Sequence, residues 1–427
     1  MKEHPRSNRI LRLLFWETTI KCNLTCAHCR RLESDEAAAT DLSTAQAIDL
    51  IGQLAELGRN QPVMPVLVFS GGEPLCRNDL FELVGKARSL GITPALATNG
   101  TLINSGVAEQ IRDSGIVRVA VSLDGATAGV HNKLRQMETS FERAIEGIGH
   151  LRDKNVPFQI NITLTKHNAH QLEDVYGLAK SLGAVAVHVF MLVPVGCGQV
   201  LAQTDMLSPQ QYERMLVEIC RLDARDELQM KVTCGPHYER VIREQGLYKA
   251  RLQAPRAPGG GGKGHKADPA VTGQLWVARP VARPSWPCVA RASSPCLIQK
   301  PPETDALHPV PGRSSHGSSK GCLAGLGVLF VGHQGNVFPC GYLPVNCGSI
   351  LETRLARPTT GGLADIWHKS KDLAKMRDSE GLEGKCGVCG YRQVCGGCRA
   401  RAYAATGNYM AEEPFCAYIP PQAVSES

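Results

Sequence analysis

The stretch "KCNLTCAHCR", residues 21–30, carries Cys22, Cys26 and Cys29 in a C-x3-C-x2-C arrangement that follows an apolar run. Three thiolates can hold three corners of a cubane iron–sulfur cluster, which leaves the fourth iron without a protein ligand. An iron with an open position can bind a small molecule through an amine and a carboxylate. Cysteine and histidine at such short spacing also suit zinc, so a zinc site is the alternative interpretation.

Outward from this stretch, short apolar runs alternate with amphipathic segments as far as residue 192. The pattern predicts strands at 12–16, 66–70, 95–98, 117–122, 158–164 and 186–192. It predicts helices near 44–57, 80–90, 105–113, 140–153 and 171–182. Six strands that alternate with helices indicate parallel βαβ units, hence an α/β sheet or barrel. Ligands of such folds bind at the carboxyl ends of the strands.

Three polar motifs follow predicted strands, namely "FSGGEPL" from Phe69, "ATNGT" from Ala97 and "VSLDG" from Val121. Glycines allow a backbone to approach a ligand closely, and a glutamate can accept hydrogen bonds from an ammonium group. The amide, hydroxyl and carboxylate groups of the other two motifs suit a ligand's carboxylate or ribose hydroxyls. Each motif alone would be an ordinary turn, so the argument depends on their joint placement at strand ends.

Together these motifs resemble the signature of the radical S-adenosylmethionine (SAM) enzymes. The resemblance implies a partial (β/α)6 TIM-like barrel over residues 10–205 and a [4Fe-4S] cluster on Cys22, Cys26 and Cys29, with SAM at the open iron. It assigns the SAM methionine amine to the Gly-Gly-Glu motif, the carboxylate to a basic residue and adenine to the end of the sixth strand. The SAM-binding residues implied are Gly71, Gly72, Glu73, Asn99, Ser122, Asp124, Arg135 and Leu192.

A second group of cysteines lies near the end of the sequence, and it resembles the SPASM or twitch extension of radical SAM enzymes. The resemblance implies one auxiliary [4Fe-4S] cluster on Cys386, Cys389, Cys395 and Cys416. Cys322, Cys340 and Cys398 would belong to a second cluster, for which the sequence offers no clear fourth ligand. Only two residues separate Cys395 from Cys398, where that extension more often has three. A structural zinc site is again the alternative.

The remaining cysteines of the well-patterned regions are interpreted as ordinary buried thiols: Cys76, Cys197, Cys220, Cys234 and Cys347. Residues 206–253 read as a mostly helical extension, with a helix that starts at Ser208 and Pro209. Residues 254–320 are rich in Pro, Gly and basic residues, which predicts a flexible insertion. Residues 321–420 are expected to form the auxiliary-cluster domain, with a hairpin at 327–338 and a helix at 364–376.

Several longer stretches resemble one particular family among the radical SAM enzymes. They include "VPFQINITLTKHN", "HVFMLVPVGCG", "FVGHQGNVFPCGYLP" and "CGGCRARAYAATGNY". They resemble the SAM-dependent heme synthases of the siroheme-based pathway. That family is expected to convert two propionates of iron-coproporphyrin III into vinyl groups, with an external reductant such as a ferredoxin or flavodoxin. Two alternatives are a sister enzyme that acts on the acetate side chains of a siroheme derivative and a SPASM peptide-maturation enzyme. Candidate substrate contacts are Arg30, Arg31, His188 and His237.

The composition of the chain bears on its compartment, its metal sites and its partners. The chain has 427 residues, 17 of them cysteine, and a formal net charge of +7. Since the sequence has no apolar run near 18 residues and no signal peptide, it predicts a cytoplasmic protein without a membrane span. Cysteines in short C-x2-C units then favour metal sites over disulfides. The mild positive charge suits an acidic substrate. The basic insertion has neither the interleaved aromatic residues nor the fold expected for nucleic-acid binding, so no nucleic-acid partner is expected.

Overall fold

The computed structural model describes residues 10–30, 40–246, 321–351 and 362–421. Arg31 and the predicted insertion at 254–320 lie outside these residues. The described strands form one ten-stranded sheet in the order β10-β9-β8-β1-β2-β3-β4-β5-β6-β7. The strands are β1 (Leu13–Glu17), β2 (Val66–Ser70), β3 (Thr93–Thr98), β4 (Val119–Ser122), β5 (Phe158–Leu164), β6 (Ala186–Met191), β7 (Gln229–Thr233), β8 (Val328–Val331), β9 (Asn336–Phe338) and β10 (Gly348–Ser349).

All neighbouring pairs from β8 through β1 to β7 are parallel, while β9 runs antiparallel to both β8 and β10. The six predicted barrel strands and the α/β fold class are confirmed. Differences at their ends are small. The third strand, for example, begins at Thr93 and therefore includes Pro94.

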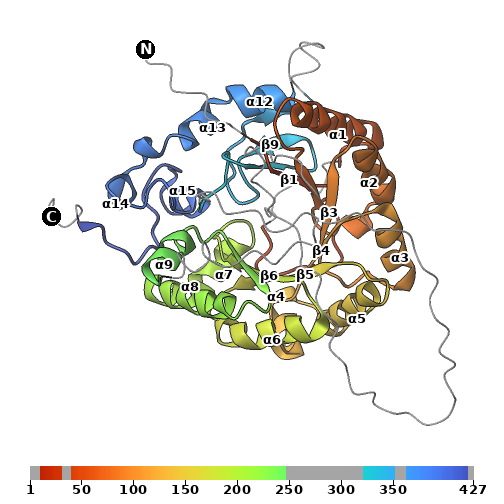
Figure 1. The fold of residues 1–427 in the computed structure, drawn as a ribbon, viewed down its shortest axis with the longest axis horizontal. Helices are drawn as coiled ribbons and strands as arrows, with labels where there is room; N and C mark the ends of the chain where they lie inside the picture. Colours follow the sequence, from red (N-terminus) through yellow and green to blue (C-terminus); the bar gives the residue numbers. More distant parts are fainter. Residues whose placement is uncertain (1–9, 31–39, 247–320, 352–361, 422–427) are drawn as a thin grey trace, which may run out of the picture. The chain divides into compact units, whose positions relative to one another are not determined.

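Most of the helices lie around the outside of the strands in Figure 1. Those that connect or follow the barrel strands are α1 (Thr44–Arg59), α2 (Leu80–Ser89), α3 (Ser105–Ser114), α4 (Ala128–Arg135), α5 (Ser140–Asp153), α6 (Leu172–Leu182), α7 (Gly198–Asp205), α8 (Pro209–Ala224) and α9 (Tyr238–Glu244). The later ones are α12 (Leu363–Lys369), α13 (Lys371–Met376), α14 (Gly384–Gly387) and α15 (Arg399–Thr406). Both α1 and α8 begin with a capping box, built by Ser43 with Gln46 and by Ser208 with Gln211.

The strands have two different faces because successive side chains alternate. On β5, Phe158, Ile160 and Ile162 belong to the main hydrophobic core, whereas Gln159 and Asn161 point to the other face. On β6, in the same way, Val187, Val189 and Met191 belong to the core, whereas His188 and Phe190 point to the other face. The inner face and the carboxyl ends of the strands are therefore the places where a site can form.

Two predicted elements differ from the structure. The segment at 206–253, expected to be mostly helical, contributes β7, which pairs in parallel with β6. Met230 and Val232 alternate into the core there, a pattern too short to stand out in the sequence. The single helix expected at 364–376 is two helices, because Ser370 interrupts it and its side chain accepts from the Leu373 N–H to cap the second one.

The predicted C-terminal hairpin is present, and its first strand, β8, joins the barrel sheet beside β1. The segment that carries the later cysteines is thus anchored directly to the strand that leads into Cys22, Cys26 and Cys29. Among the helices that the structure describes, none has the length and apolar character needed to cross a membrane.

Candidate functional site

The loop that carries Cys22, Cys26 and Cys29 leaves the carboxyl end of β1 and is half-buried. The residues between β1 and Cys22 are held in place, because the Thr18 N–H donates to Ser70 O at 2.8 Å. Within the loop, the Leu24 N–H donates to Cys22 Sγ at 3.4 Å. Such N–H donors stabilise a thiolate, which is the form that binds iron.

The glycines of "FSGGEPL" pack against this loop. The Gly72 N–H donates to Thr19 O and the Glu73 N–H to Lys21 O, both at 2.8 Å. A Cβ on Gly71 would lie 2.6 Å from Thr19 O, and one on Gly72 would lie 2.3 Å from Lys21 O. Gly71 also has a φ of 148°, which other residues rarely adopt. The close approach visible in the structure is therefore to the cysteine loop itself.

We expect Gly72→Ala to lower the free energy of unfolding by about 1–3 kcal/mol, because the new methyl group would force the cysteine loop away. Gly85→Ala is the matched control, since a Cβ at this position in α2 meets open space. Alanine there should stabilise the helix by up to about 1 kcal/mol. Urea unfolding of both variants and their iron content after reconstitution check this. Equal stability and equal iron content in the two variants would contradict it.

Glu73 is fully buried and accepts hydrogen bonds from Thr98 Oγ1 and from the Asn99 N–H, both at 2.8 Å. Burial raises the pKa of Glu73 to about 7, although these hydrogen bonds oppose the shift. A nearby ammonium group would favour the carboxylate and lower this pKa again. These hydrogen bonds hold the Glu73 carboxylate at the carboxyl end of β3. Its contact with the methionine amine of SAM stays a prediction.

The turn after β3 also holds the cysteine loop. The Asn99 side chain donates to Asn23 Oδ1 at 2.9 Å, and the Asn23 side chain donates to Thr101 Oγ1 at 2.8 Å. Asn23 lies directly after Cys22, so this contact fixes the start of the cluster motif.

Asp124 and Arg135 lie close to Cys26 and His28, in the second half of the cysteine motif. Arg135 Nη2 forms an ion pair with Asp124 Oδ2 at 2.7 Å, and Arg135 Nη1 lies 3.7 Å from Cys26 Sγ. His28 Nε2 lies 3.3 Å from the same Asp124 oxygen. Burial alone would raise the pKa of Asp124, but the positive charge of Arg135 outweighs it and lowers that pKa. Burial lowers the pKa of His28 to about 4, so this imidazole is neutral at pH 7.

Ser122 and Leu192 complete the predicted SAM residues. Ser122 ends β4, and Leu192 directly follows β6, where its N–H donates to Leu164 O at 3.4 Å. The structure thus brings all eight predicted SAM residues to the carboxyl ends of strands or, for Arg135, to the end of α4 beneath the cysteine loop. Their individual contacts with SAM stay predictions.

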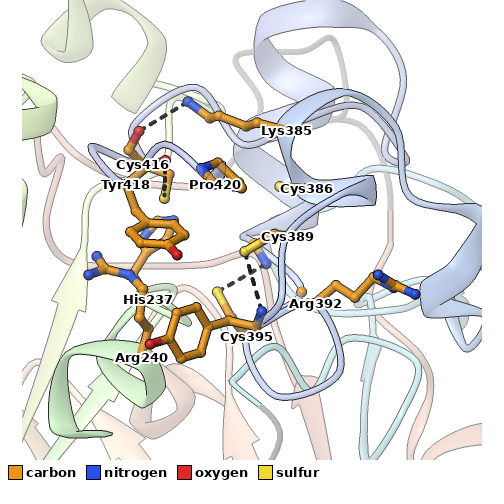
Figure 2. Close-up of a pocket in the computed structure, with 13 residues that line it drawn as sticks. His237, Arg240, Lys385, Cys386, Cys389, Arg392, Cys395, Cys416, Tyr418 and Pro420 are labelled. Atoms are coloured by element: carbon orange, nitrogen blue, oxygen red, sulfur yellow. Dashed lines mark hydrogen bonds between the residues drawn. The ribbon is translucent and has the colours of Figure 1, made fainter. Parts of the chain in front are cut away.

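Four of the later cysteines line one pocket (Figure 2): Cys386, Cys389, Cys395 and Cys416. Main-chain N–H groups donate to three of the sulfurs. The distances are 3.4 Å from Glu413 to Cys386, 3.4 Å from Tyr391 to Cys389 and 3.5 Å from Gly397 to Cys395. Four thiols around a space, with N–H donors aimed at the sulfurs, are a donor set that fits a [4Fe-4S] cluster.

His237 also lines this pocket and contacts Cys416. Its Nε2 forms an ion pair with Glu413 Oε2 at 2.5 Å, and Glu413 Oε1 accepts from Arg401 Nε at 2.8 Å. Burial would lower the pKa of His237, but the Glu413 carboxylate and the Cys416 contact raise it to about 9. His237, predicted as a substrate contact, is therefore a charged neighbour of a cysteine in the structure.

Cys322, Cys340 and Cys398 also lie near one another. Burial and the neighbouring thiols of Cys322 and Cys398 raise the pKa of Cys340 to about 12. Among the described residues, no group of three or more Cys, His, Asp or Glu side chains surrounds a single point as the ligands of one metal ion do. A cubane differs in this respect, because each thiolate binds a different iron.

The other candidate substrate contacts face the inner side of the sheet. Arg30 Nη2 forms an ion pair with Glu17 Oε1 at 2.7 Å, and its guanidinium lies 4.2 Å from the centroid of the Phe330 ring. His188 is buried on β6, with its Nδ1 3.0 Å from Gln159 Nε2. Burial and the positive charge of Lys231 lower the pKa of His188 well below its usual value. Their contacts with a substrate stay predictions.

Sequence reasoning missed Glu17 as the residue that positions this arginine. Its other carboxylate oxygen lies 3.0 Å from His333 Nδ1. Burial would raise the pKa of Glu17, but Arg30 and His333 lower it to about 2. No local signal in the sequence joins residues 17 and 333. Only the pairing of β1 with β8 brings them together.

Comparisons with known proteins agree with this geometry. A model of the Radical SAM superfamily matches residues 16–179. The AdoMet-dependent heme synthase of Methanosarcina barkeri is 38% identical over 96% of this chain and 97% of its own length. The Fe-coproporphyrin III synthase of the same organism is 32% identical over only 45% of this chain and 47% of its own length. The crystal structure of Streptococcus suis SuiB bound to the precursor peptide SuiA superimposes with a TM-score of 0.61 at 14% identity, over 96% of this chain and 76% of SuiB.

Proposed function

The chain belongs to the AdoMet-dependent heme synthase family of radical SAM enzymes, and we propose from this that it oxidatively decarboxylates two propionates of iron-coproporphyrin III to vinyl groups, giving heme b. The family gives the chain a role in heme biosynthesis and a porphyrin-type substrate, with a [4Fe-4S] cluster and SAM as cofactors. The particular porphyrin and the reaction at its side chains are what the proposal adds.

The observation that carries the proposal is the extent of the match. The identity of 38% extends over almost the whole of both chains, including the cysteine-rich C-terminal segment. The Fe-coproporphyrin III synthase, by contrast, matches less than half of this chain. Chemistry supports the same reading. Each propionate must lose CO2, one hydrogen atom and one electron to become a vinyl group, so the protein needs both a hydrogen-abstracting centre and an exit for an electron.

The cluster held by Cys22, Cys26 and Cys29 supplies, together with bound SAM, a 5′-deoxyadenosyl radical that abstracts hydrogen atoms. The task of the protein around it is to hold the cysteine loop and to exclude water. The contacts of Gly72, Asn99 and Arg135 with that loop do the first of these. The cluster proposed on Cys386, Cys389, Cys395 and Cys416 would supply the electron acceptor.

Substrate recognition is proposed to involve Arg30. Glu17 and the Phe330 ring position its guanidinium on the inner face of the sheet. A flat porphyrin packs well against aromatic rings and guanidinium planes, and a propionate accepts charge-assisted hydrogen bonds from an arginine. His188 contributes a buried polar group on the same inner face. An external reductant, a ferredoxin or flavodoxin, is proposed to deliver the electron that starts each turnover.

An anaerobic assay tests the proposal. Reconstituted protein is incubated with reductant, SAM and iron-coproporphyrin III. The porphyrin products are then separated by chromatography and identified by mass spectrometry. We expect the monovinyl and divinyl products, the latter being heme b, and none without SAM. If the protein leaves iron-coproporphyrin III unchanged but removes the acetate carboxyl groups of the siroheme derivative, the sister activity is correct and the proposal is wrong.

A further inference from the structure

We propose that His237 is a positioning residue for the auxiliary cluster, because it donates a hydrogen bond to the Cys416 sulfur and thereby raises the reduction potential at which the cluster accepts an electron. The inference rests on the proposed function in that it takes the four cysteines of the pocket in Figure 2 as [4Fe-4S] ligands. His237 then acts on the exit of the electron, and not on the porphyrin that the sequence suggested as its partner.

His237 is buried beside one of the cluster ligands. It immediately precedes α9, and its side chain is only 1% exposed. The imidazole lines the pocket of the four cysteines and shares a hydrogen bond with the Cys416 side chain. A thiolate that binds iron can only accept a hydrogen bond, so His237 is the donor.

Three neighbours hold the imidazole in this orientation. His237 Nε2 lies 2.5 Å from Glu413 Oε2, and Glu413 Oε1 accepts from Arg401 Nε at 2.8 Å. Arg401 Nη2 in turn donates to the Tyr212 hydroxyl at 2.8 Å. The Tyr212 ring packs edge-on against the imidazole, with 5.2 Å between the ring centroids. Outer partners of this kind fix a histidine next to a metal site and set its donor role.

The charges of this buried group favour the reduced form of the cluster. His237 donates to a carboxylate and to a thiolate, and Arg401 is charged at any physiological pH, so two positive groups face the single carboxylate of Glu413. Charges interact more strongly in the protein interior than in water. Reduction adds a negative charge to the cluster, and the net charge nearby and hydrogen bonds to the sulfurs set its potential. Both features therefore raise that potential.

The potential matters because each propionate releases one electron. Once a hydrogen atom has been abstracted, the bond to the carboxylate carbon breaks, CO2 leaves, the vinyl double bond forms and one electron passes to an acceptor. His237 favours the auxiliary cluster as that acceptor. An oxidised one-electron carrier of the ferredoxin or flavodoxin class then takes the electron onward.

A purely structural role is the alternative, since the ion pairs also join α9 to α15 and to the segment that ends in Cys416. The two roles differ in what a substitution changes. Loss of a structural contact lowers stability, whereas loss of the donor to the Cys416 sulfur lowers the reduction potential of a cluster that is still bound.

A potentiometric titration of the anaerobic, reconstituted protein, followed by electron paramagnetic resonance, tests the inference without any porphyrin. The signal of this cluster is the one that Cys386→Ala loses and that Cys220→Ala keeps, because Cys220 is a buried core thiol on α8. His237→Phe keeps a flat ring and removes the donors. We expect it to make reduction of this cluster at least tenfold less favourable, equivalent to about 59 mV for one electron, with the iron content of the wild type.

His237→Gln restores one N–H donor, and its potential should lie between those of His237→Phe and the wild type. A potential as low as that of His237→Phe would contradict the hydrogen bond as the cause. His150→Phe is the matched control, because His150 lies on α5 beside Glu146, and it should keep the wild-type potential.

A wild-type potential in His237→Phe overturns the inference. If that variant does not hold the cluster, His237→Leu is measured in its place, and loss of the cluster from both variants assigns His237 a structural role and also overturns it. The same holds if no signal depends on Cys386. A protein that shows the expected shifts but makes no heme b would refute the proposed function and leave the role of His237 intact.

Discussion

Replacing Cys22, Cys26 and Cys29 together by alanine should reduce the reductive cleavage of SAM by at least about 1,000-fold, equivalent to about 4 kcal/mol. The reason is the loss of the iron that this three-cysteine motif leaves without a protein ligand, and without it the amine and carboxylate of SAM have no metal to bind. The variant should also lose about four irons per chain. Anaerobic assays of 5′-deoxyadenosine formation and iron analysis measure the two effects on the same sample.

The fold should survive this change, because the loop is held by contacts that do not involve the sulfurs. These include the Gly72 N–H to Thr19 O and the Asn99 side chain to Asn23. Cys220→Ala again serves as the control and should keep the wild-type rate of cleavage. Cleavage at the wild-type rate by the triple variant would mean that these cysteines do not hold the catalytic cluster.

Cys386→Ala should separate the two halves of the reaction. We expect the rate of SAM cleavage to stay within about twofold of the wild-type value while vinyl formation falls at least about 100-fold, a loss of about 2.7 kcal/mol or more. Cys386 lies in the pocket of the later cysteines, remote in sequence from the SAM motifs, and its removal leaves an incomplete ligand set. The ratio of 5′-deoxyadenosine to vinyl product, measured at several times, shows the uncoupling.

Because Cys386 accepts an N–H from Glu413, its loss also disturbs the buried group that Glu413 forms with His237 and Arg401. Lys385→Ala, next in the chain, is therefore the control, since it removes a side chain that lines the same pocket without removing a thiol. It should stay coupled. Full vinyl formation by Cys386→Ala would remove the electron-acceptor role from this cysteine set.

The barrel could be predicted from the sequence because each of its strands and helices is recognisable from a short stretch of residues. An apolar run such as "VLVFS", residues 66–70, followed by glycines and then by an amphipathic helix, identifies a buried strand and its carboxyl end without knowledge of the rest of the chain. The ends of successive parallel strands meet at one edge, so the motifs at Gly71, Asn99 and Asp124 could be placed together before the structure was known.

The rest depends on contacts between segments far apart in the chain, which carry no local signal. Arg135 beside Cys26 and Glu17 beside His333 are examples. Cys234 is the clearest, since a lone cysteine after a five-residue strand that was itself missed looks like any buried thiol. Its neighbours Cys340 and Cys398 come from the C-terminal segment, and only the three-dimensional packing of that segment beside the end of β7 reveals them.

The glycines of the Gly-Gly-Glu motif were recognised correctly, but the reason for their presence was incomplete. From the sequence, we expected them to allow the backbone to approach a ligand. In the structure a methyl group at Gly72 would meet the carbonyl of Lys21, one residue before the first cluster cysteine. The motif therefore holds the loop that holds the iron, and any contact with SAM comes in addition.

The position of β8 beside β1 also bears on how this chain folds. Strand β1 pairs with β2 on one side and with β8 on the other, and about 300 residues separate β1 from β8 in the sequence. During synthesis, the buried apolar strand "LLFWE" therefore presents an unpaired edge until the C-terminal segment has emerged. Such edges pair readily with other chains and cause aggregation. The segment that carries the later cysteines thus also covers the edge of the first barrel strand.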